Sequence, residues 1–133
     1  MSALARYFLA QKWLVSGSDA SPSQLLQKLK NEAVKVKIGH KKGIIAPKTA
    51  LVIYNQAIPL SSNPEIREAR RRGIKILSYP QALGELTRKY KTIAVSGAHG
   101  KSTTTALLSL ILMKAGFDPM VIVGTLLKEF GDR

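Results

Sequence analysis

The residues best suited to chemistry lie in one short segment, residues 97–103, which reads Gly-Ala-His-Gly-Lys-Ser-Thr. A β-branched stretch precedes it at residues 92–95, and an apolar segment with helical spacing follows it at residues 106–113. This order predicts a strand, a glycine turn and a helix. At the start of such a helix, the unpaired N–H groups and the positive end of the helix dipole attract phosphate.

The two residues that follow the second glycine have defined roles in a phosphate loop. A lysine at position 101 neutralises β- and γ-phosphate oxygens, and the hydroxyl of Ser102 binds Mg²⁺. The full motif has a glycine where this chain has Val95. A chance Gly-Lys-Ser is the alternative, but its position between a strand and a helix favours a phosphate loop. We therefore predict that Lys101 and Ser102 contact phosphate and metal.

Length and composition limit the classes of protein that remain. The chain has 133 residues, enough for one domain, or for one domain and a piece of another. It has no cysteine, which excludes disulfides and thiolate metal sites. No apolar run approaches the ~20 residues of a membrane span, and residues 1–12 lack the apolar core of a signal peptide. We expect a cytoplasmic protein without a membrane partner.

The charge is strongly positive, with 21 Lys and Arg against 8 Asp and Glu and a formal net charge of +13. Such a balance favours anionic partners, namely nucleotides, nucleic acid or acidic lipid headgroups. The basic residues mostly alternate with apolar ones or fall at the ends of predicted helices. A solvated face explains this distribution better than a nucleic-acid stripe, so we expect no nucleic-acid partner.

The first half of the chain alternates between helical and strand patterns. We predict helices at residues 2–12 and up to about residue 31, the second opened by a capping box at Ser21 with Pro22 at its first position. Strands are predicted at residues 14–19 and 34–38. The carboxylate of Asp19 ends the first of them. It could hold a ribose hydroxyl or simply form a turn, and the sequence leaves both open.

The pattern continues up to the phosphate loop. Residues 51–54 predict a strand buried on both faces, and Asn63-Pro64-Glu65 predicts a helix start with a polar cap and an acid in the first turn. That helix should end at three arginines before Gly73, and a strand and a second capping box at Ser78 should follow. A further strand is predicted at residues 120–124. We expect a parallel α/β sheet with a domain boundary near residue 90.

Four segments together resemble the Mur ligases, most closely the members that join L-alanine to UDP-N-acetylmuramate. They are Val-Ser-Gly-Ser-Asp at residues 15–19, Asn-Pro-Glu at 63–65, Gly-Ile-Lys-Ile-Leu-Ser at 73–78 and Gly-Ala-His-Gly-Lys-Ser-Thr at 97–103. The resemblance implies an enzyme that phosphorylates a carboxylate with ATP and Mg²⁺ and lets an amine displace the phosphate. It also implies that Lys101 and His99 are catalytic and that Ser102 binds the metal. The residues implied to bind ATP are Gly97, Ala98, His99, Gly100, Lys101, Ser102 and Thr103. Those implied to bind the UDP-sugar are Ser2, Ser18 and Asp19.

The resemblance also predicts what the chain lacks. It implies a UDP-sugar-binding Rossmann-like domain at residues 1–89 without its first strand and glycine-rich turn, and the beginning of an ATP-binding P-loop domain at residues 90–133. Asn55-Gln56 stands where the family usually has two serines. We therefore expect a ligase fragment without activity of its own. The alternatives are a nucleotide-binding module without catalysis and a basic nucleic-acid-binding protein.

Overall fold

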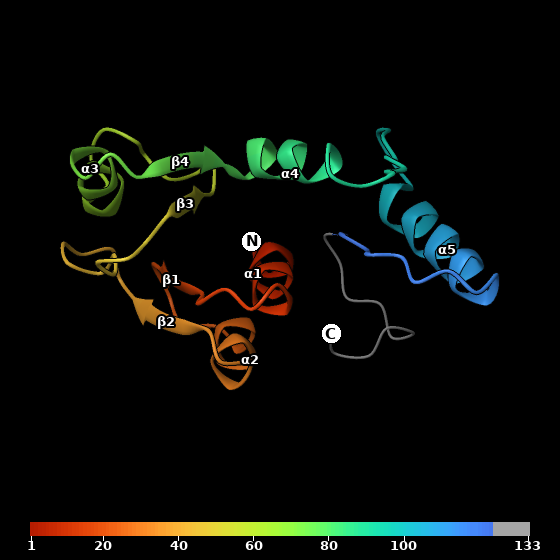
Figure 1. Cartoon of the computed structure of the whole chain (residues 1–133), viewed down its shortest axis with the longest axis horizontal. Coiled ribbons are helices and arrows are strands. Elements are labelled where there is room, and N and C mark those ends of the chain that lie inside the picture. The colour runs from red at the N-terminus through yellow and green to blue at the C-terminus, as the bar shows by residue number, and fades with distance from the viewer. Residues whose placement is uncertain (124–133) are drawn as a thin grey trace. The chain divides into compact units, whose positions relative to one another are not determined.

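The computed structural model describes residues 1–123 and divides the chain into two units, Met1–Lys91 and a second that begins at Thr92. The first unit is α/β, and the described part of the second contains one helix (Figure 1). A predicted strand at residues 120–124 lies partly outside the described residues.

The first unit contains two small parallel sheets. Strand β1 (Ser16–Asp19) pairs with β2 (Lys35–Ile38), and β3 (Leu51–Tyr54) pairs with β4 (Lys75–Ser78) (Figure 1). Helices α2 (Gln24–Asn31) and α3 (Pro64–Arg71) form the two crossovers that parallel pairing requires. The prediction of parallel α/β structure is confirmed. Within the described residues β1 and β3 are not hydrogen-bonded to each other, so the four strands form two separate sheets. The absence of a first strand between them stays a prediction.

The core of the first unit is small and is built mostly from helices. Helix α1 (Ser2–Ala10) buries Leu4 to 1% exposure, and α4 (Tyr79–Thr87) buries Ala82 and Leu86. Strand β3, predicted to be buried on both faces, is only half-buried along its length. Leu14, directly before β1, is 99% exposed. Each strand has a single neighbour, so neither sheet is wide enough to be covered as parallel sheets usually are.

The helix caps show how local sequence positions these elements. Asn63 caps α3, with its Oδ1 accepting from the N–H groups of Glu65 at 2.9 Å and Ile66 at 3.1 Å. The capping box at Ser78 is confirmed, since Gln81 returns the bond to the Ser78 N–H at 2.8 Å. The capping box predicted at Ser21 is wrong. Ser23 caps α2 instead, because its extended backbone lets its hydroxyl accept from the Leu26 N–H at 3.2 Å.

In the second unit, α5 (Lys101–Lys114) confirms the predicted helix after the glycine turn. The strand predicted at residues 92–95 is absent, and residues 120–123 are also not in a strand. A strand needs a hydrogen-bonded neighbour, and the described residues of this unit provide none. The α5 surface consequently keeps large apolar side chains exposed, including Leu107 and Ile111.

Two arginines join segments that lie far apart in the first unit. Arg6 on α1 makes a bidentate pair with Glu32, the residue that ends α2, through two bonds of 2.8 Å. The Arg6 guanidinium holds the pKa of Glu32 below its usual value. Arg72, which ends α3, donates to the carbonyl oxygens of Ile45, Ala46 and Pro47 at 2.7–3.1 Å. The loop before β3 is thereby fixed to α3.

The Arg6–Glu32 pair predicts a pH-dependent contribution to stability. A carboxyl whose pKa is lowered by folding stabilises the fold above its unfolded-state pKa, and this contribution disappears as pH falls through the folded-state value. Glu32→Gln should therefore lower the free energy of unfolding by about 0.5–1 kcal/mol at pH 7. In thermal melts the gap between the two proteins should narrow as the pH falls below the usual pKa of a glutamate. An E32Q effect of equal size at pH 7 and at acidic pH would contradict the assignment.

Candidate functional site

The glycine turn forms an uncapped helix start in the second unit. Gly100 is the N-cap of α5 with a φ of 75°, in the left-handed region that favours glycine, and no side chain bonds to the first-turn N–H groups. Lys101, Ser102 and Thr103 are the first three helical residues, and all three are exposed. The first-turn N–H groups of α5 therefore have no side-chain acceptor, and unpaired donors of this kind are how helix N-termini bind phosphate.

The lysine of this loop bends back over the turn. Its Nζ donates to the carbonyl oxygens of Gly97 at 2.6 Å and Ala98 at 3.0 Å. The ammonium group is therefore held against the loop by groups that an incoming anion can replace. Further along α5, the Ser109 hydroxyl donates to the Thr105 and Ala106 carbonyls, so its polar atom is satisfied within the helix.

His99 is separate from this arrangement. It lies in the exposed turn, and within residues 1–123 its ring makes no hydrogen bond or ion pair. A catalytic role for His99 stays a prediction. The described residues also contain no group of three or more acidic or histidine side chains that could hold a metal by themselves. A magnesium ion at Ser102 would therefore depend on phosphate oxygens and water for most of its ligands.

The three residues predicted at the UDP-sugar lie at different ends of elements in the first unit. Ser2 is the first residue of α1, whose N-terminus has no side-chain cap. Asp19 ends β1, and its Oδ1 accepts from the Ser21 N–H at 3.3 Å. The carboxylate thus closes a local turn, which is one of the two interpretations of Asp19 that the sequence leaves open. Ser18 is the residue that the structure brings into a larger polar group.

That polar group, which we call the Ser–His–Glu cluster, consists of Ser18, His40 and Glu65. The Ser18 hydroxyl donates to Glu65 Oε1 at 2.6 Å, and His40 Nδ1 lies 3.0 Å from both the Ser18 Oγ and the same carboxylate oxygen. The His40 and Glu65 side chains are 24% and 14% exposed. Ser18 comes from β1, His40 follows β2, and Glu65 lies in the first turn of α3, so the cluster joins the two small sheets.

Sequence reasoning missed most of this cluster. Glu65 is well explained as the first-turn acid of α3, and a single loop histidine is usually a surface residue. One signal was present, however. Ser18 and His40 lie close to the carboxyl ends of two adjacent parallel strands, and such ends meet at the edge where α/β sheets bind ligands.

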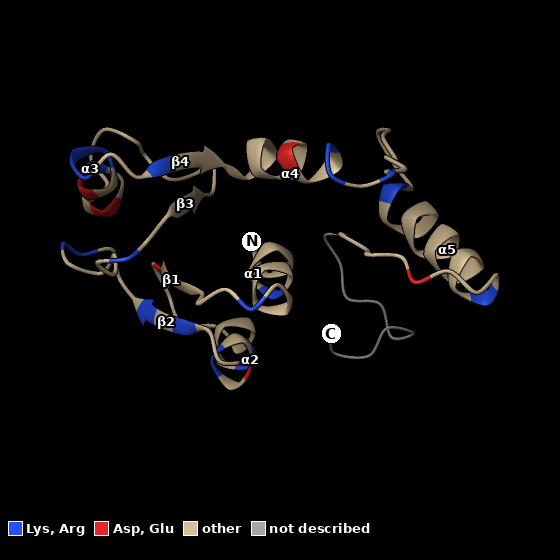
Figure 2. Ribbon diagram, viewed as in Figure 1, with Lys and Arg blue, Asp and Glu red and all other residues tan. Residues whose placement is uncertain are grey.

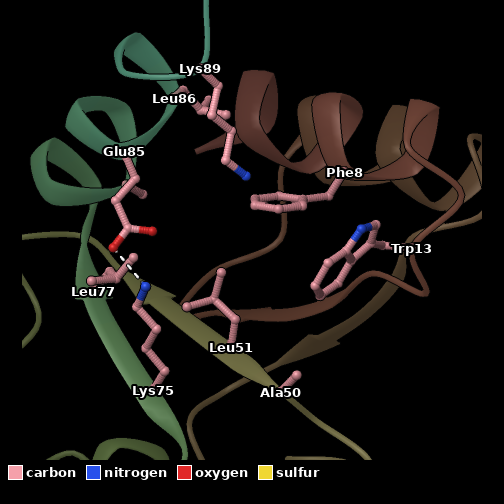
Figure 3. A pocket seen from close by; sticks show the side chains of 10 residues that line it. Phe8, Trp13, Ala50, Leu51, Lys75, Leu77, Glu85, Leu86 and Lys89 are labelled. Carbon is pink, nitrogen blue, oxygen red and sulfur yellow. Dashed lines mark hydrogen bonds and ion pairs between the residues drawn. The ribbon is translucent and has the colours of Figure 1, made fainter.

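A cavity of about 220 Å³ lies in the first unit, beside β3 and β4. Phe8 and Trp13 point into the same space as Leu51, and the ion pair between Lys75 and Glu85, 2.6 Å long, borders it (Figure 3). Most of its lining is apolar, with Ala50, Leu77, Ala82, Leu86 and Lys89 completing it. The cavity is therefore suited to apolar side chains rather than to a nucleotide.

Lysines and arginines occur on most of the helices and strands, as the blue segments of the ribbon show (Figure 2). Several of them have structural partners: Arg6 binds Glu32, Arg71 binds Glu68, and Arg72 binds backbone carbonyls. On α3, Glu65 lies in the first turn and Arg70 and Arg71 lie in the last turn, where the helix dipole favours an acid and a base respectively. None of the helices within residues 1–123 has the length and apolar character to cross a membrane.

The family profile described as "Mur ligase family, catalytic domain" matches residues 1–91, more than half of the chain. The chain belongs to the Mur ligase family. Curated relatives agree with this placement. The UDP-N-acetylmuramate–L-alanine ligase of Clostridium botulinum strain Langeland is 45% identical over 125 residues, covering 93% of this chain and 27% of the relative. The ligase of the same name from Carboxydothermus hydrogenoformans is 38% identical over 131 residues, covering 98% and 28%.

Solved structures of Mur ligases extend the comparison to the fold. UDP-N-acetylmuramate–alanine ligase from Thermotoga maritima matches with a TM-score of 0.88 at 26% identity, covering 97% of this chain and 30% of that one. A murein peptide ligase from Psychrobacter arcticus matches with a TM-score of 0.74 at 30% identity, covering 96% and 28%. This Mur ligase chain therefore spans less than a third of the length of these relatives.

The geometry of the α5 start predicts how Ser102 responds to substitution. Ser102→Ala should weaken Mg²⁺-dependent ATP binding, because only the hydroxyl can act as a metal ligand, whereas Ser102→Thr should retain it. Isothermal titration with ATP in the presence and absence of Mg²⁺ measures the difference. Equal Mg²⁺ dependence in both variants would remove Ser102 from the site.

Proposed function

We propose that this chain supplies the N-terminal part of an ATP-dependent ligase that joins L-alanine to UDP-N-acetylmuramate for peptidoglycan synthesis. The observation that carries the proposal is the exposed Gly-Lys-Ser turn at the uncapped start of α5, in a chain that belongs to the Mur ligase family. Relatives that share 38–45% of its residues bear this activity in their names. Because the chain spans under a third of those relatives, we propose that it is inactive alone.

The proposed reaction has two steps. The carboxylate of UDP-N-acetylmuramate attacks the γ-phosphorus of ATP, forming an acyl phosphate and releasing ADP. The amine of L-alanine then attacks the acyl carbon, loses a proton and displaces inorganic phosphate to leave an amide. Both steps pass through anionic transition states, and fixed positive groups stabilise such states most effectively.

The loop residues fit this demand. Lys101 lies over the turn, where exchanging the Gly97 and Ala98 carbonyls for phosphate oxygens replaces two neutral acceptors with charged ones. The first-turn N–H groups of Lys101, Ser102 and Thr103 add donors that are fixed before the substrate binds. Mg²⁺, held in part by Ser102, supplies charge neutralisation at the phosphates. We assign Gly97, Ala98 and Gly100 to the backbone of the same site and His99 to its rim.

We further propose that residues 1–89 bind the UDP-sugar and that residues 90–133 begin the ATP-binding domain. In this proposal a strand from outside the 133 residues pairs with both β1 and β3 and completes one parallel sheet. The unpaired edges of the two sheets, the exposed Leu14 and the apolar cavity beside Leu51 support it. Such a strand would lead into the start of α1, where Ser2 would meet the pyrophosphate.

A nucleotide-binding module without catalysis is the second candidate, because the loop alone would serve it equally well. ATP binding by this chain does not separate the two candidates, whereas turnover does. A chimera in which this chain replaces the matching 131 residues of the Carboxydothermus ligase provides that measurement. Amide formation by the chimera would support the ligase.

Lys101→Ala should abolish most turnover in this chimera. Removing one fixed electrostatic contact from the transition state typically lowers the rate by about 10²- to 10³-fold. Arg71→Ala is the matched control, because Arg71 lies exposed on α3 and pairs only with Glu68 within the described residues. Phosphate release and product formation measured together give the rate. Turnover of K101A within about threefold of the parent would contradict the assignment.

The unpaired sheet edges predict weak protection of the strands. Amide hydrogens of β1 and β3 should exchange rapidly, because neither strand has a partner on its second edge. Adding an upstream strand and glycine turn of the kind that the Mur ligase resemblance implies should slow exchange in both strands and sharpen the unfolding transition. Hydrogen exchange followed by mass spectrometry checks both effects. Slow exchange in the chain as it stands would show that the two sheets need no further strand.

A further inference from the structure

The hydrogen atoms of the Ser–His–Glu cluster can be assigned from its geometry. Ser18 has one hydroxyl hydrogen, and the 2.6 Å contact donates it to Glu65 Oε1. An ionised carboxylate can only accept. The contact of His40 Nδ1 with Glu65 and its contact with the Ser18 oxygen therefore both require a hydrogen on Nδ1. In the neutral ring this leaves Nε2 without a hydrogen.

The bare nitrogen is available for a ligand. Within the part of the chain that the structure describes, Nε2 of His40 has no hydrogen-bond partner, and the ring is 24% exposed. The cluster lies where β1 and β2 end, which is the edge of a parallel sheet that binds ligands. A hydrogen-bond acceptor at this place is complementary to a hydroxyl or an N–H group.

We propose that Glu65 is a positioning residue of the sugar-nucleotide site. It holds His40 as the Nδ1–H tautomer, so that Nε2 accepts a hydrogen bond from a hydroxyl or N–H of the UDP-sugar. Ser18 serves the same end, since its only hydrogen is used on Glu65 and its oxygen accepts from His40. This inference rests on the proposed function. It assigns the contact with the UDP-sugar to His40, whereas the sequence predicts that contact at Ser18.

Glu65 contacts His40 from the half of the first unit that contains the other sheet. Its backbone N–H is bonded to the Asn63 cap, so the carboxylate is fixed at the start of α3. Helix α3 joins β3 to β4, whereas the two residues that Glu65 binds belong to the β1–β2 half. Glu65 therefore sets the orientation of the His40 ring from the opposite sheet.

The tautomer can be tested on the chain itself by ¹⁵N NMR of the histidine rings at pH 8. The chain has only two histidines, so His99→Gln assigns the signals, and His99 serves as the exposed reference. We expect His40 to carry its hydrogen on Nδ1, and Glu65→Ala to shift it toward the pattern of His99. Glu65→Gln, which keeps an acceptor oxygen, should retain Nδ1–H in part. Glu68→Ala, one turn along α3, should change nothing. An Nε2–H or doubly protonated His40 in the parent would overturn the proposal.

The chimera tests the link to substrate. Glu65→Ala should raise the KM for UDP-N-acetylmuramate about tenfold, the usual effect of losing one hydrogen bond, while the KM for ATP stays unchanged. Glu65→Gln should recover part of the affinity, and Glu68→Ala should match the parent. Circular dichroism confirms that each variant folds. An unchanged KM in a folded E65A chimera would overturn the positioning role and leave the ligase assignment intact. A parent chimera without turnover would instead contradict the proposed function, and the NMR result would still decide the tautomer.

Discussion

The constraint on which this structure depends is the pairing of backbone hydrogen bonds between parallel strands. Among residues 1–123, each strand of the first unit has one hydrogen-bonded neighbour, so each sheet leaves two edges without partners there. The shallow burial of β3 and the full exposure of Leu14 follow from this constraint. Beside the small apolar core, side-chain bonds join separate segments of the unit: the Arg6–Glu32 pair, the Arg72 bonds to the loop before β3, and the Ser–His–Glu cluster.

Elements were predictable where a local signal determines local structure. The caps at Asn63 and Ser78 were read correctly, because their partners lie within three residues along the chain. The cap of α2 is different, because Ser21 and Ser23 both precede the same apolar run and only the extended backbone at Ser23 identifies the cap. The strand predicted at residues 92–95 fails for a different reason. β-branched residues favour a strand, but pairing depends on a neighbour that no local pattern can report.

The candidate site divides in the same way. The loop from Gly97 to Thr103 could be recognised from sequence because its residues are consecutive and lie between elements of known type. In the Ser–His–Glu cluster, Ser18 and His40 are 22 positions apart and His40 and Glu65 are 25 positions apart, and the three residues come from a strand, a loop and a helix. Nothing in the spacing of Glu65 distinguishes a first-turn acid from a hydrogen-bond partner. Only the tertiary structure reveals that the carboxylate of Glu65 contacts the imidazole ring of His40.

The apolar surface of α5 affects how the chain behaves in solution. Leu107, Ile111 and Phe117 remain exposed along or just after this helix, while the chain as a whole carries a net charge of +13. Like-charge repulsion keeps such molecules apart at low ionic strength, although their apolar faces attract. Added salt shortens the range of that repulsion to roughly 8 Å at physiological strength and leaves the attraction in place. Colloidal stability should therefore decline as salt rises, which makes ionic strength the first variable to control when the chain is concentrated.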